Sequence, residues 1–208
     1  MFLFTLVLGL LFLQEADNLK CRECSSAPFG ICTQTTTECP SLSDRCVTAT
    51  KVAYTGGMFN ERNVKSCIVA ELCLNFSVNN GTHRLLYKSS CCSEDLCNAQ
   101  TDYPEPDNKF TPNGKKCFSC QGENCMKTLY CVGDENYCFK ETGNVDGVSL
   151  TDKGCVSEAL CSDQFSSLTQ LTGAKFSCCQ GDYCNSASSA SPALLLLLVP
   201  LLFSNLFS

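Results

Sequence analysis

Two stretches, Cys91-Cys92-Ser93-Glu94-Asp95-Leu96-Cys97-Asn98 and Cys178-Cys179-Gln180-Gly181-Asp182-Tyr183-Cys184-Asn185, decide the fold. Each consists of a cysteine pair, four residues, a third cysteine and an asparagine. The chain has 20 Cys among 208 residues, a share of about 10% that is typical of a disulfide scaffold. Such scaffolds form in oxidising compartments, so we expect a secreted or surface protein.

The cysteines before each of these stretches form a repeat. The gaps between successive cysteines are 2, 7, 6, 6, 20, 5, 17, 0 and 4 residues in the first half, and 2, 4, 5, 6, 16, 5, 16, 0 and 4 in the second. Five of the nine gaps are identical, and loops of variable length account for the others. The sequence therefore predicts two homologous modules, 19–98 and 117–185, joined by a polar, proline-containing linker, 99–116.

The two ends of the chain have the composition of processing signals. Residues 2–13 are a short apolar run directly after Met1, which predicts a signal peptide, 1–16. At the other end, small residues precede an apolar tail that contains Pro200 and has no Lys or Arg after it. This pattern predicts a glycosylphosphatidylinositol (GPI) attachment signal, with 186–208 as the propeptide and Asn185, Ser186 or Ala187 as the attachment residue. The alternatives are a short transmembrane span and a soluble product.

Alternating residues between the cysteines predict strands rather than helices. In the first module, Val47 to Val52 leads into the turn signal Gly56-Gly57 and returns through Arg62 to Cys67, which predicts a hairpin that we call the second finger. A second hairpin, 72–90, has Asn79-Asn80-Gly81 at its tip, where Asn-Gly favours a type I′ turn; we call it the third finger. The second module repeats this pattern with tips at 144–147 and 171–173. We expect an all-β protein.

Spacing alone leaves the pairing of ten cysteines per module open. The opening Leu19-Lys20-Cys21-Arg22-Glu23-Cys24, together with both closing stretches, resembles the lymphocyte-antigen/urokinase-receptor family, whose modules adopt the three-finger fold. The chain is also similar to the gamma-class phospholipase inhibitors, which have two such modules without this tail.

The resemblance implies ten disulfides and a structural role for the last asparagine of each module. In the first module the implied pairs are Cys21–Cys46, Cys24–Cys32, Cys39–Cys67, Cys73–Cys91 and Cys92–Cys97. In the second they are Cys117–Cys138, Cys120–Cys125, Cys131–Cys155, Cys161–Cys178 and Cys179–Cys184. Asn98 and Asn185 would bond backbone groups inside the module rather than a ligand.

The sequence contains little that supports catalysis, so we expect no enzyme, no cofactor and no metal. Its only histidine, His83, lies near the tip of the third finger, where we expect an exposed polar residue rather than a catalytic base. The spacing Cys21-x2-Cys24, repeated at Cys117 and Cys120, also occurs in zinc sites, but disulfides are the favoured interpretation in a secreted chain. A net charge of −6 argues against nucleic-acid binding.

Asn75 and Asn80 are N-glycosylation acceptors in the motifs Asn75-Phe76-Ser77 and Asn80-Gly81-Thr82. We expect Asn80, at a turn, to be the more accessible of the two, and the third finger to be solvated. The second finger is the candidate partner surface, because Tyr54, Met58, Phe59 and Arg62 flank its tip. The alternative interpretation is that Met58 and Phe59 pack against the rest of the fold.

The second module has 4 Lys against 9 Asp and Glu, a net charge of −5, which is typical of a solvated face. Together these features predict a GPI-anchored cell-surface glycoprotein that binds an extracellular protein through its finger loops. One alternative is a secreted inhibitor of an extracellular enzyme such as a phospholipase. Another is a modulator of membrane receptors or channels.

Overall fold

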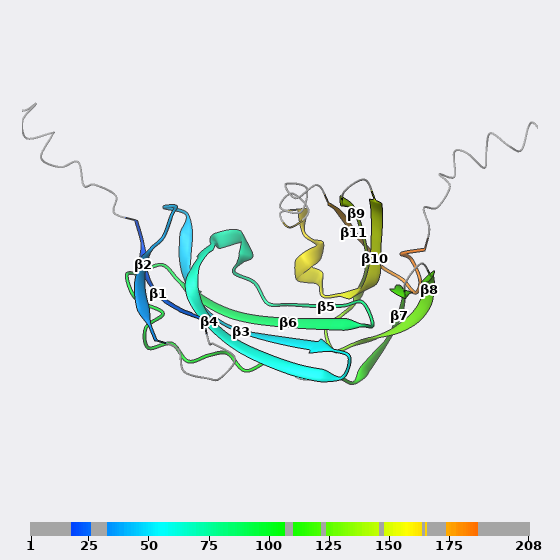
Figure 1. Ribbon diagram of the computed structural model, residues 1–208, viewed down its shortest axis with the longest axis horizontal. Helices are drawn as coiled ribbons and strands as arrows, with labels where there is room; N and C mark the ends of the chain where they lie inside the picture. The colour runs from blue at the N-terminus through cyan, green and yellow to red at the C-terminus, as the bar shows by residue number, and fades with distance from the viewer. Residues whose placement is uncertain are drawn as a thin grey trace, which may run out of the picture. The chain divides into compact units, whose positions relative to one another are not determined.

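The computed structural model describes residues 18–25, 33–106, 110–121, 124–145, 148–163, 165 and 174–186. The predicted signal peptide, the tip at 171–173 and most of the C-terminal tail lie outside these residues. The described chain is built almost entirely of strands, which confirms the all-β prediction (Figure 1). The strands are β1 (Lys20–Ser25), β2 (Thr35–Glu38), β3 (Asp44–Thr55), β4 (Met58–Val69), β5 (Phe76–Asn79), β6 (His83–Cys92), β7 (Pro112–Gln121), β8 (Asn124–Val132), β9 (Tyr137–Val145), β10 (Val148–Val156) and β11 (Lys175–Cys179).

Two short 3-10 helices, η1 (Ala70–Leu72) and η2 (Glu158–Cys161), interrupt the strands.

The chain divides into two compact units that are not simple halves of the sequence. Unit 1 comprises 1–75 and 86–107, and unit 2 comprises 76–85 and 108–208. The tip of the third finger, 76–85, therefore belongs to unit 2, although the cysteine repeat places it inside the first module.

In unit 1, β3 and β4 form the longest hairpin, with continuous antiparallel pairing from Asp44–Val69 to Thr55–Met58. The turn residues Gly56 and Gly57 have φ angles of 57° and 82°, which is the combination that a type I′ turn requires and that glycine adopts without steric cost. Strand β1 pairs with β2 on one side and with β4 on the other. The predicted second finger is thus a regular ribbon with a two-residue turn.

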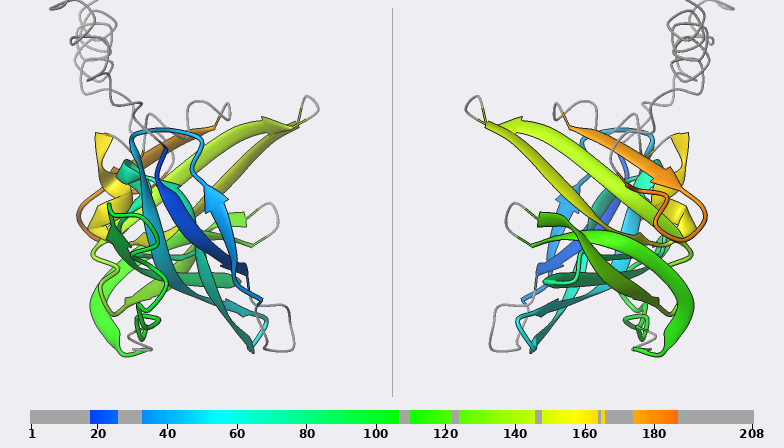
Figure 2. Two further views of the ribbon diagram at one scale, coloured as in Figure 1. Left: turned by 90° about the vertical axis from the view of Figure 1, so that its left-hand side faces the viewer. Right: turned by 90° about the vertical axis from the view of Figure 1, so that its right-hand side faces the viewer.

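Unit 2 contains the β9–β10 hairpin, to which β11 is added through β9 (Figure 2). Strand β5 pairs with β10 at Val78–Val156 and Asn79–Cys155, so the third-finger tip continues the sheet of this unit. A separate two-stranded ribbon is formed by β7 and β8. Buried cysteines form a cluster in the core of each unit, and a few large apolar side chains, among them Val52 and Phe139, are buried as well.

Nine disulfides lie among the described residues, and each joins a pair that the family resemblance implies. They are Cys21–Cys46, Cys39–Cys67, Cys73–Cys91, Cys92–Cys97, Cys117–Cys138, Cys120–Cys125, Cys131–Cys155, Cys161–Cys178 and Cys179–Cys184. Cys24 is also disulfide-bonded, but Cys32, its implied partner, lies outside the described residues. No described cysteine is free.

Asn98 and Asn185 close the two units in the same way. The side-chain oxygen of Asn98 accepts the N–H of Arg22, and its Nδ2 donates to the carbonyls of Arg22 and Val47, at 2.9–3.0 Å. Asn185 makes the matching three bonds with Phe118 and Phe139, each of 2.9 Å. Both asparagines are buried, so these bonds satisfy backbone groups that water does not reach.

The third finger differs from the sequence-based expectation in two respects. Gly81 has a φ of 89°, but Asn80 is not among the described residues with positive φ, so the predicted type I′ turn is wrong. Instead, the side-chain oxygen of Asn80 accepts the N–H groups of Thr82 and His83. The finger is also only partly solvated: Gly81, Thr82 and His83 are exposed at its tip, whereas Ser77, Asn79 and Arg84 are buried within unit 2.

Part of the predicted linker is ordered against unit 1. The ammonium group of Lys65 donates to the carbonyl of Ala99 and lies 5.2 Å from the ring centroid of Tyr103. Burial lowers the pKa of Lys65, and the carboxylate of Asp102 opposes this shift only in part. On the unit 2 side, β7 begins at Pro112, inside the predicted linker.

Candidate functional site

The tip of the β3–β4 hairpin holds all four residues that the sequence nominated for partner contact. Tyr54 and Phe59 are directly opposed across the ladder, and their ring centroids lie 5.3 Å apart. Met58 begins β4 directly after the turn, and Arg62 follows four residues later on the same strand. The two-residue turn fixes this register, so the four side chains are held on one short length of hairpin.

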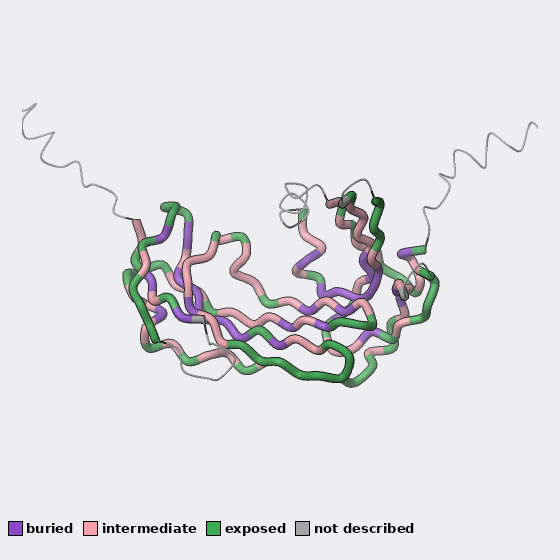
Figure 3. The backbone as a smooth tube through the Cα atoms, viewed as in Figure 1, coloured by how far each residue is buried: buried purple, intermediate pink, exposed green. Residues whose placement is uncertain are grey.

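Met58 and Phe59 are exposed to 73% and 52% of their surface. Of the alternatives, packing against the palm of the first module, the part of the fold from which the fingers extend, is therefore not what unit 1 shows, and packing against the second module stays a prediction. Exposed residues follow one another from Met58 to Arg62 along β4 (Figure 3). Large apolar side chains that remain in water at a rigid tip are a common feature of protein-binding surfaces.

A groove of about 410 Å³ runs beside these residues on the hairpin, and we call it the hairpin groove. It is lined by Lys51, Ala53, Thr55, Met58, Phe59, Asn60 and Arg62. Three cross-strand pairs, Lys51–Arg62, Ala53–Asn60 and Thr55–Met58, supply six of the seven residues. Because side chains alternate between the two faces of a strand, these pairs share one face of the hairpin. The groove has cationic and apolar walls and no acidic residue.

Four residues of the groove were not nominated from the sequence, Lys51, Ala53, Thr55 and Asn60, and Lys51 is the charged one among them. It lies on the strand before the turn, in a stretch that the pattern assigns only to a hairpin. The signal that reveals it is the turn itself, since counting outward from Gly56-Gly57 pairs Lys51 with Arg62. Like charges directly opposite one another destabilise a pair of strands. The Lys51–Arg62 pair is therefore not explained by a contribution to folding, which makes this surface a candidate for binding.

The two glycosylation motifs lie in different surroundings. Asn75 is exposed, and its side-chain oxygen accepts the N–H of Ser89. Asn80 is half-buried, and its Nδ2 donates to a carboxylate oxygen of Asp152 at 2.8 Å. Because Nδ2 is the atom to which carbohydrate is attached, the structure favours Asn75 over Asn80, which is the reverse of the order expected from sequence.

A buried polar network surrounds Arg84 within unit 2. Its Nε donates to Oε1 of Glu135 at 2.7 Å, and its guanidinium carbon lies 5.0 Å from the ring centroid of Phe110. The other carboxylate oxygen of Glu135 accepts the side-chain N–H of Asn79 and the backbone N–H of Val132. Burial raises the pKa of Glu135, although the Arg84 guanidinium and these donors counteract part of the rise.

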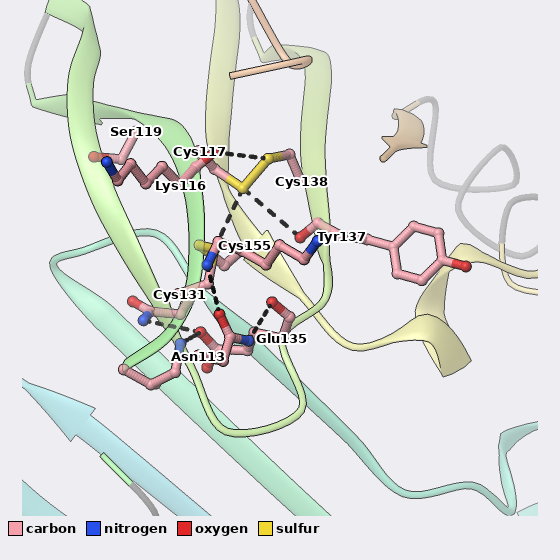
Figure 4. Close-up of a disulfide and its surroundings, with 12 residues drawn as sticks. Asn113, Lys116, Cys117, Ser119, Cys131, Glu135, Tyr137, Cys138 and Cys155 are labelled. Atoms are coloured by element: carbon pink, nitrogen blue, oxygen red, sulfur yellow. Dashed lines mark hydrogen bonds between the residues drawn. A yellow bond between two sulfur atoms is a disulfide. The ribbon is translucent and has the colours of Figure 1, made fainter. Parts of the chain in front are cut away.

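Glu135 is fixed by its backbone as well as by its side chain. Figure 4 shows the loop that carries it beside the Cys117–Cys138 disulfide, with the side chain of Asn113 bonded to this loop. The Nδ2 of Asn113 donates to the carbonyls of Gly133 and Glu135, at 3.2 and 3.1 Å. The disulfide core and the Arg84 network are therefore continuous, and we regard this region as structural.

The remaining sequence candidates are spread over the two units. His83 is exposed at the start of β6. Cys21, Cys24, Cys117 and Cys120, the residues of the zinc alternative, are all disulfide-bonded, so they offer no thiolate ligand. Within the described ranges, no helix has the length and apolarity needed to cross a bilayer.

The three candidate GPI attachment residues also differ in their surroundings. Asn185 is buried by its bonds inside unit 2, whereas Ser186 is exposed and donates its N–H to the carbonyl of Tyr183. Ala187 lies outside the described residues. Ser186 is therefore the most accessible of the described candidates.

Comparison with known proteins identifies the family. Residues 17–100 match the u-PAR/Ly-6 domain, and residues 116–185 match the snake toxin and toxin-like protein domain. The chain is 30% identical to a gamma-type phospholipase A2 inhibitor of Gloydius brevicaudus siniticus, over 77% of this chain and 84% of that protein. The protein thus belongs to the u-PAR/Ly-6 family of three-finger proteins.

Two further relatives show how the family varies. The urokinase plasminogen activator surface receptor of Bos taurus is 28% identical over 89% of this chain, which spans 63% of the receptor's length. Ly6/PLAUR domain-containing protein 8 of Bos taurus is 24% identical over 74% of this chain and 71% of its own length. By name, the relatives thus include a surface receptor and an inhibitor.

Proposed function

We propose that the protein is a GPI-anchored cell-surface glycoprotein that binds an extracellular protein and performs no catalysis. The observation that carries the proposal is the exposure of Met58 and Phe59 at a rigid hairpin tip, beside the hairpin groove. A partner that covers these side chains removes their apolar surface from water, and this burial stabilises the complex through the hydrophobic effect. Because disulfides and the two-residue turn hold the tip, little conformational entropy is lost on binding.

The relatives support a binding role. One is named as a surface receptor and another as an inhibitor, and neither name describes an enzyme. Both functions consist of holding another protein through surface contacts. The described cysteines are bonded in disulfides, so none of them offers a thiolate nucleophile, and the single histidine is exposed.

The anchor is proposed from the C-terminal sequence, in which small residues precede an apolar tail with no basic residue after it. The protein would then face outward from the plasma membrane, attached at Asn185, Ser186 or Ala187. Of these, Ser186 is proposed as the attachment residue, because it is exposed whereas Asn185 is buried.

The anchor is tested by treating intact cells that express the full chain with phosphatidylinositol-specific phospholipase C. Release of the protein into the medium supports the anchor. Retention on the cells would contradict it in favour of a membrane span, and protein already present in untreated medium would point to secretion. Partner binding is tested separately, by adhesion of the wild-type and Phe59→Ala proteins to cells and matrix.

A second candidate function is inhibition of a secreted phospholipase A2. The observation that favours it is the 30% identity to a phospholipase A2 inhibitor over 84% of that protein. The test is phospholipid hydrolysis by purified secreted phospholipases with and without the protein. Stoichiometric inhibition would establish this function, and unchanged hydrolysis would contradict it.

A third candidate, modulation of membrane receptors or channels, follows from the match of the second module to toxin-like proteins. It is tested by recording receptor currents in the presence of the protein.

A further inference from the structure

The hairpin groove combines a cationic end with an apolar end. Lys51 and Arg62 lie directly opposite one another on β3 and β4, and both are exposed. The one ion pair between described residues joins Arg84 and Glu135. Lys51 and Arg62 therefore form no ion pair with a described residue. No Asp or Glu is among the seven residues that line the groove. The groove therefore carries two uncompensated positive charges in a chain whose net charge is −6.

The second feature is the apolar end of the same groove. Met58 lies four residues before Arg62 on β4, and Phe59 lines the groove beside it. At about 3.3 Å per residue, the apolar end and the cationic end are separated by roughly 13 Å along the strand. The face between them is formed by Ala53 and Asn60, and Thr55 lies opposite Met58 at the apolar end. These small or polar side chains leave room for an extended chain.

We propose that the hairpin groove binds an extended acidic segment of a partner protein. One or two carboxylates of that segment pair with Lys51 and Arg62, and a large apolar side chain about four residues away packs on Met58 and Phe59. Charge complementarity selects the carboxylates, and the exposed apolar end selects a protein over a sulfated polysaccharide, which has no apolar group to place there. This inference rests on the proposed binding function and specifies the chemistry of its partner.

The test uses cells that display the full chain, with the amount at the surface measured through an epitope tag. If the chain is not retained at the surface, the protein collected from the medium is used instead. The probe is a short fluorescent peptide with two adjacent glutamates and a phenylalanine about four residues further on. The control peptide has glutamines in place of the glutamates. We expect saturable binding of the acidic peptide, weakened by added NaCl, and no binding of the control.

The variants separate the two ends of the groove. Lys51→Gln and Arg62→Gln should each reduce the affinity for the acidic peptide about fivefold, the upper range for exposed ion pairs. Met58→Ala should reduce it as well, without changing its dependence on salt. Lys175→Gln removes the same charge from an exposed lysine of unit 2 and should leave the affinity unchanged.

Three results would overturn the inference. The first is equal binding of both peptides, and the second is unchanged affinity for the acidic peptide in Lys51→Gln and Arg62→Gln. The third is that a heparin-derived oligosaccharide binds instead of the peptide, and that Lys51→Gln and Arg62→Gln abolish this binding. Self-association lost in these variants would likewise assign the groove to a second copy of the chain. If the peptides fail but Phe59→Ala still abolishes adhesion, the proposed function stands and only the chemistry of the partner is wrong. If adhesion is also unaffected, binding through this finger is wrong as well.

Discussion

Arg84 and Glu135 form a buried ion pair across 51 positions of sequence, with the side chain of Glu135 completely shielded and that of Arg84 exposed to only 6%. The pair ties the third-finger tip, which belongs to the first cysteine repeat, into unit 2. Asn79 and Ser77 extend the same connection, since they donate to Glu135 and Asp134. The boundary between the compact units therefore does not follow the boundary between the repeats.

Replacing one member of this pair should destabilise unit 2 strongly. We expect Arg84→Met to lower the free energy of unfolding by about 3–5 kcal/mol, because Glu135 is left buried without its cation. The measurement is denaturant unfolding of the disulfide-intact protein. Adding Glu135→Gln to Arg84→Met should recover part of the loss, since the unpaired buried charge is then removed.

The matched control for this prediction is Arg62→Met, which makes the same change at an exposed arginine. We expect it to alter the free energy of unfolding by no more than about 0.5 kcal/mol. Equal effects of Arg84→Met and Arg62→Met would show that the buried pair contributes nothing specific.

Gly154 permits the close approach of β10 to the third-finger tip. A Cβ at this position would overlap the carbonyl oxygen of Asn79 and lie 2.8 Å from the Cα of Asn80 and from the ring of Phe139. We expect Gly154→Ala to cost about 1–3 kcal/mol or more through overpacking against backbone. Gly143→Ala, on the opposing strand β9, meets no atom within 4 Å and should be nearly neutral. Similar melting temperatures for the two variants would contradict this account.

Glu141 and Asp152 place two carboxylates opposite one another on β9 and β10. Burial, followed by the charge of Asp152, raises the pKa of Glu141 above its ordinary value of 4.5. The folded state therefore holds this proton more tightly than the unfolded state. The protonated carboxyl of Glu141 therefore contributes to the stability of the folded state. This contribution is fully present below pH 4.5 and is lost as the pH rises through the folded-state pKa of Glu141.

We accordingly expect Glu141→Gln to stabilise the protein at neutral pH by roughly 0.2–1 kcal/mol, the range for cross-strand pairs. At pH values below the ordinary pKa, the variant and the wild type should have the same stability. Unfolding curves measured from acidic to neutral pH decide the point, with Glu61→Gln, an exposed glutamate of unit 1, as control. A stabilisation that does not change with pH would rule out the proposed charge repulsion.

Carbohydrate should be found at Asn75 rather than at Asn80. In protein from mammalian cells, Asn75→Gln should remove a glycan-sized mass, and Asn80→Gln should leave the mass of the carbohydrate unchanged, because the Asn80 amide is bonded to Asp152. Thr82→Ala is the control, since it destroys the second motif and leaves Asn80 in place. A loss of glycan in both Asn80→Gln and Thr82→Ala would restore the order expected from sequence.

Much of the fold could be predicted because cysteine spacing and glycine turns are local signals. The β3–β4 hairpin follows from Gly56-Gly57, whose turn also sets the pairing of Lys51 with Arg62. The equivalence of Asn98 and Asn185 follows from the repeated closing motif. In each case, residues close together in the sequence decide the result.

The third finger could not be predicted in the same way, since its tip is determined by residues far along the chain. Asn80 looks like a turn residue in an exposed glycosylation motif, and only Asp152 makes it a half-buried donor. Arg84 likewise looks like a surface residue until Glu135 is placed beside it. The hairpin groove could be predicted only in part, because Met58, Phe59 and Arg62 are recognisable by type, whereas Lys51 is recognisable only by its register.

The division of unit 2 between residues 76–85 and 108–208 has a consequence for biosynthesis. The ribosome delivers the finger tip well before the strands that will enclose it, so Arg84 and Asn79 are synthesised before their partner Glu135. During this interval the first module has an unfinished edge that chaperones can bind. Chains truncated after residue 98 would leave Arg84 and Asn79 without Glu135, so we expect the third-finger tip of such chains to be less stable than in the full chain.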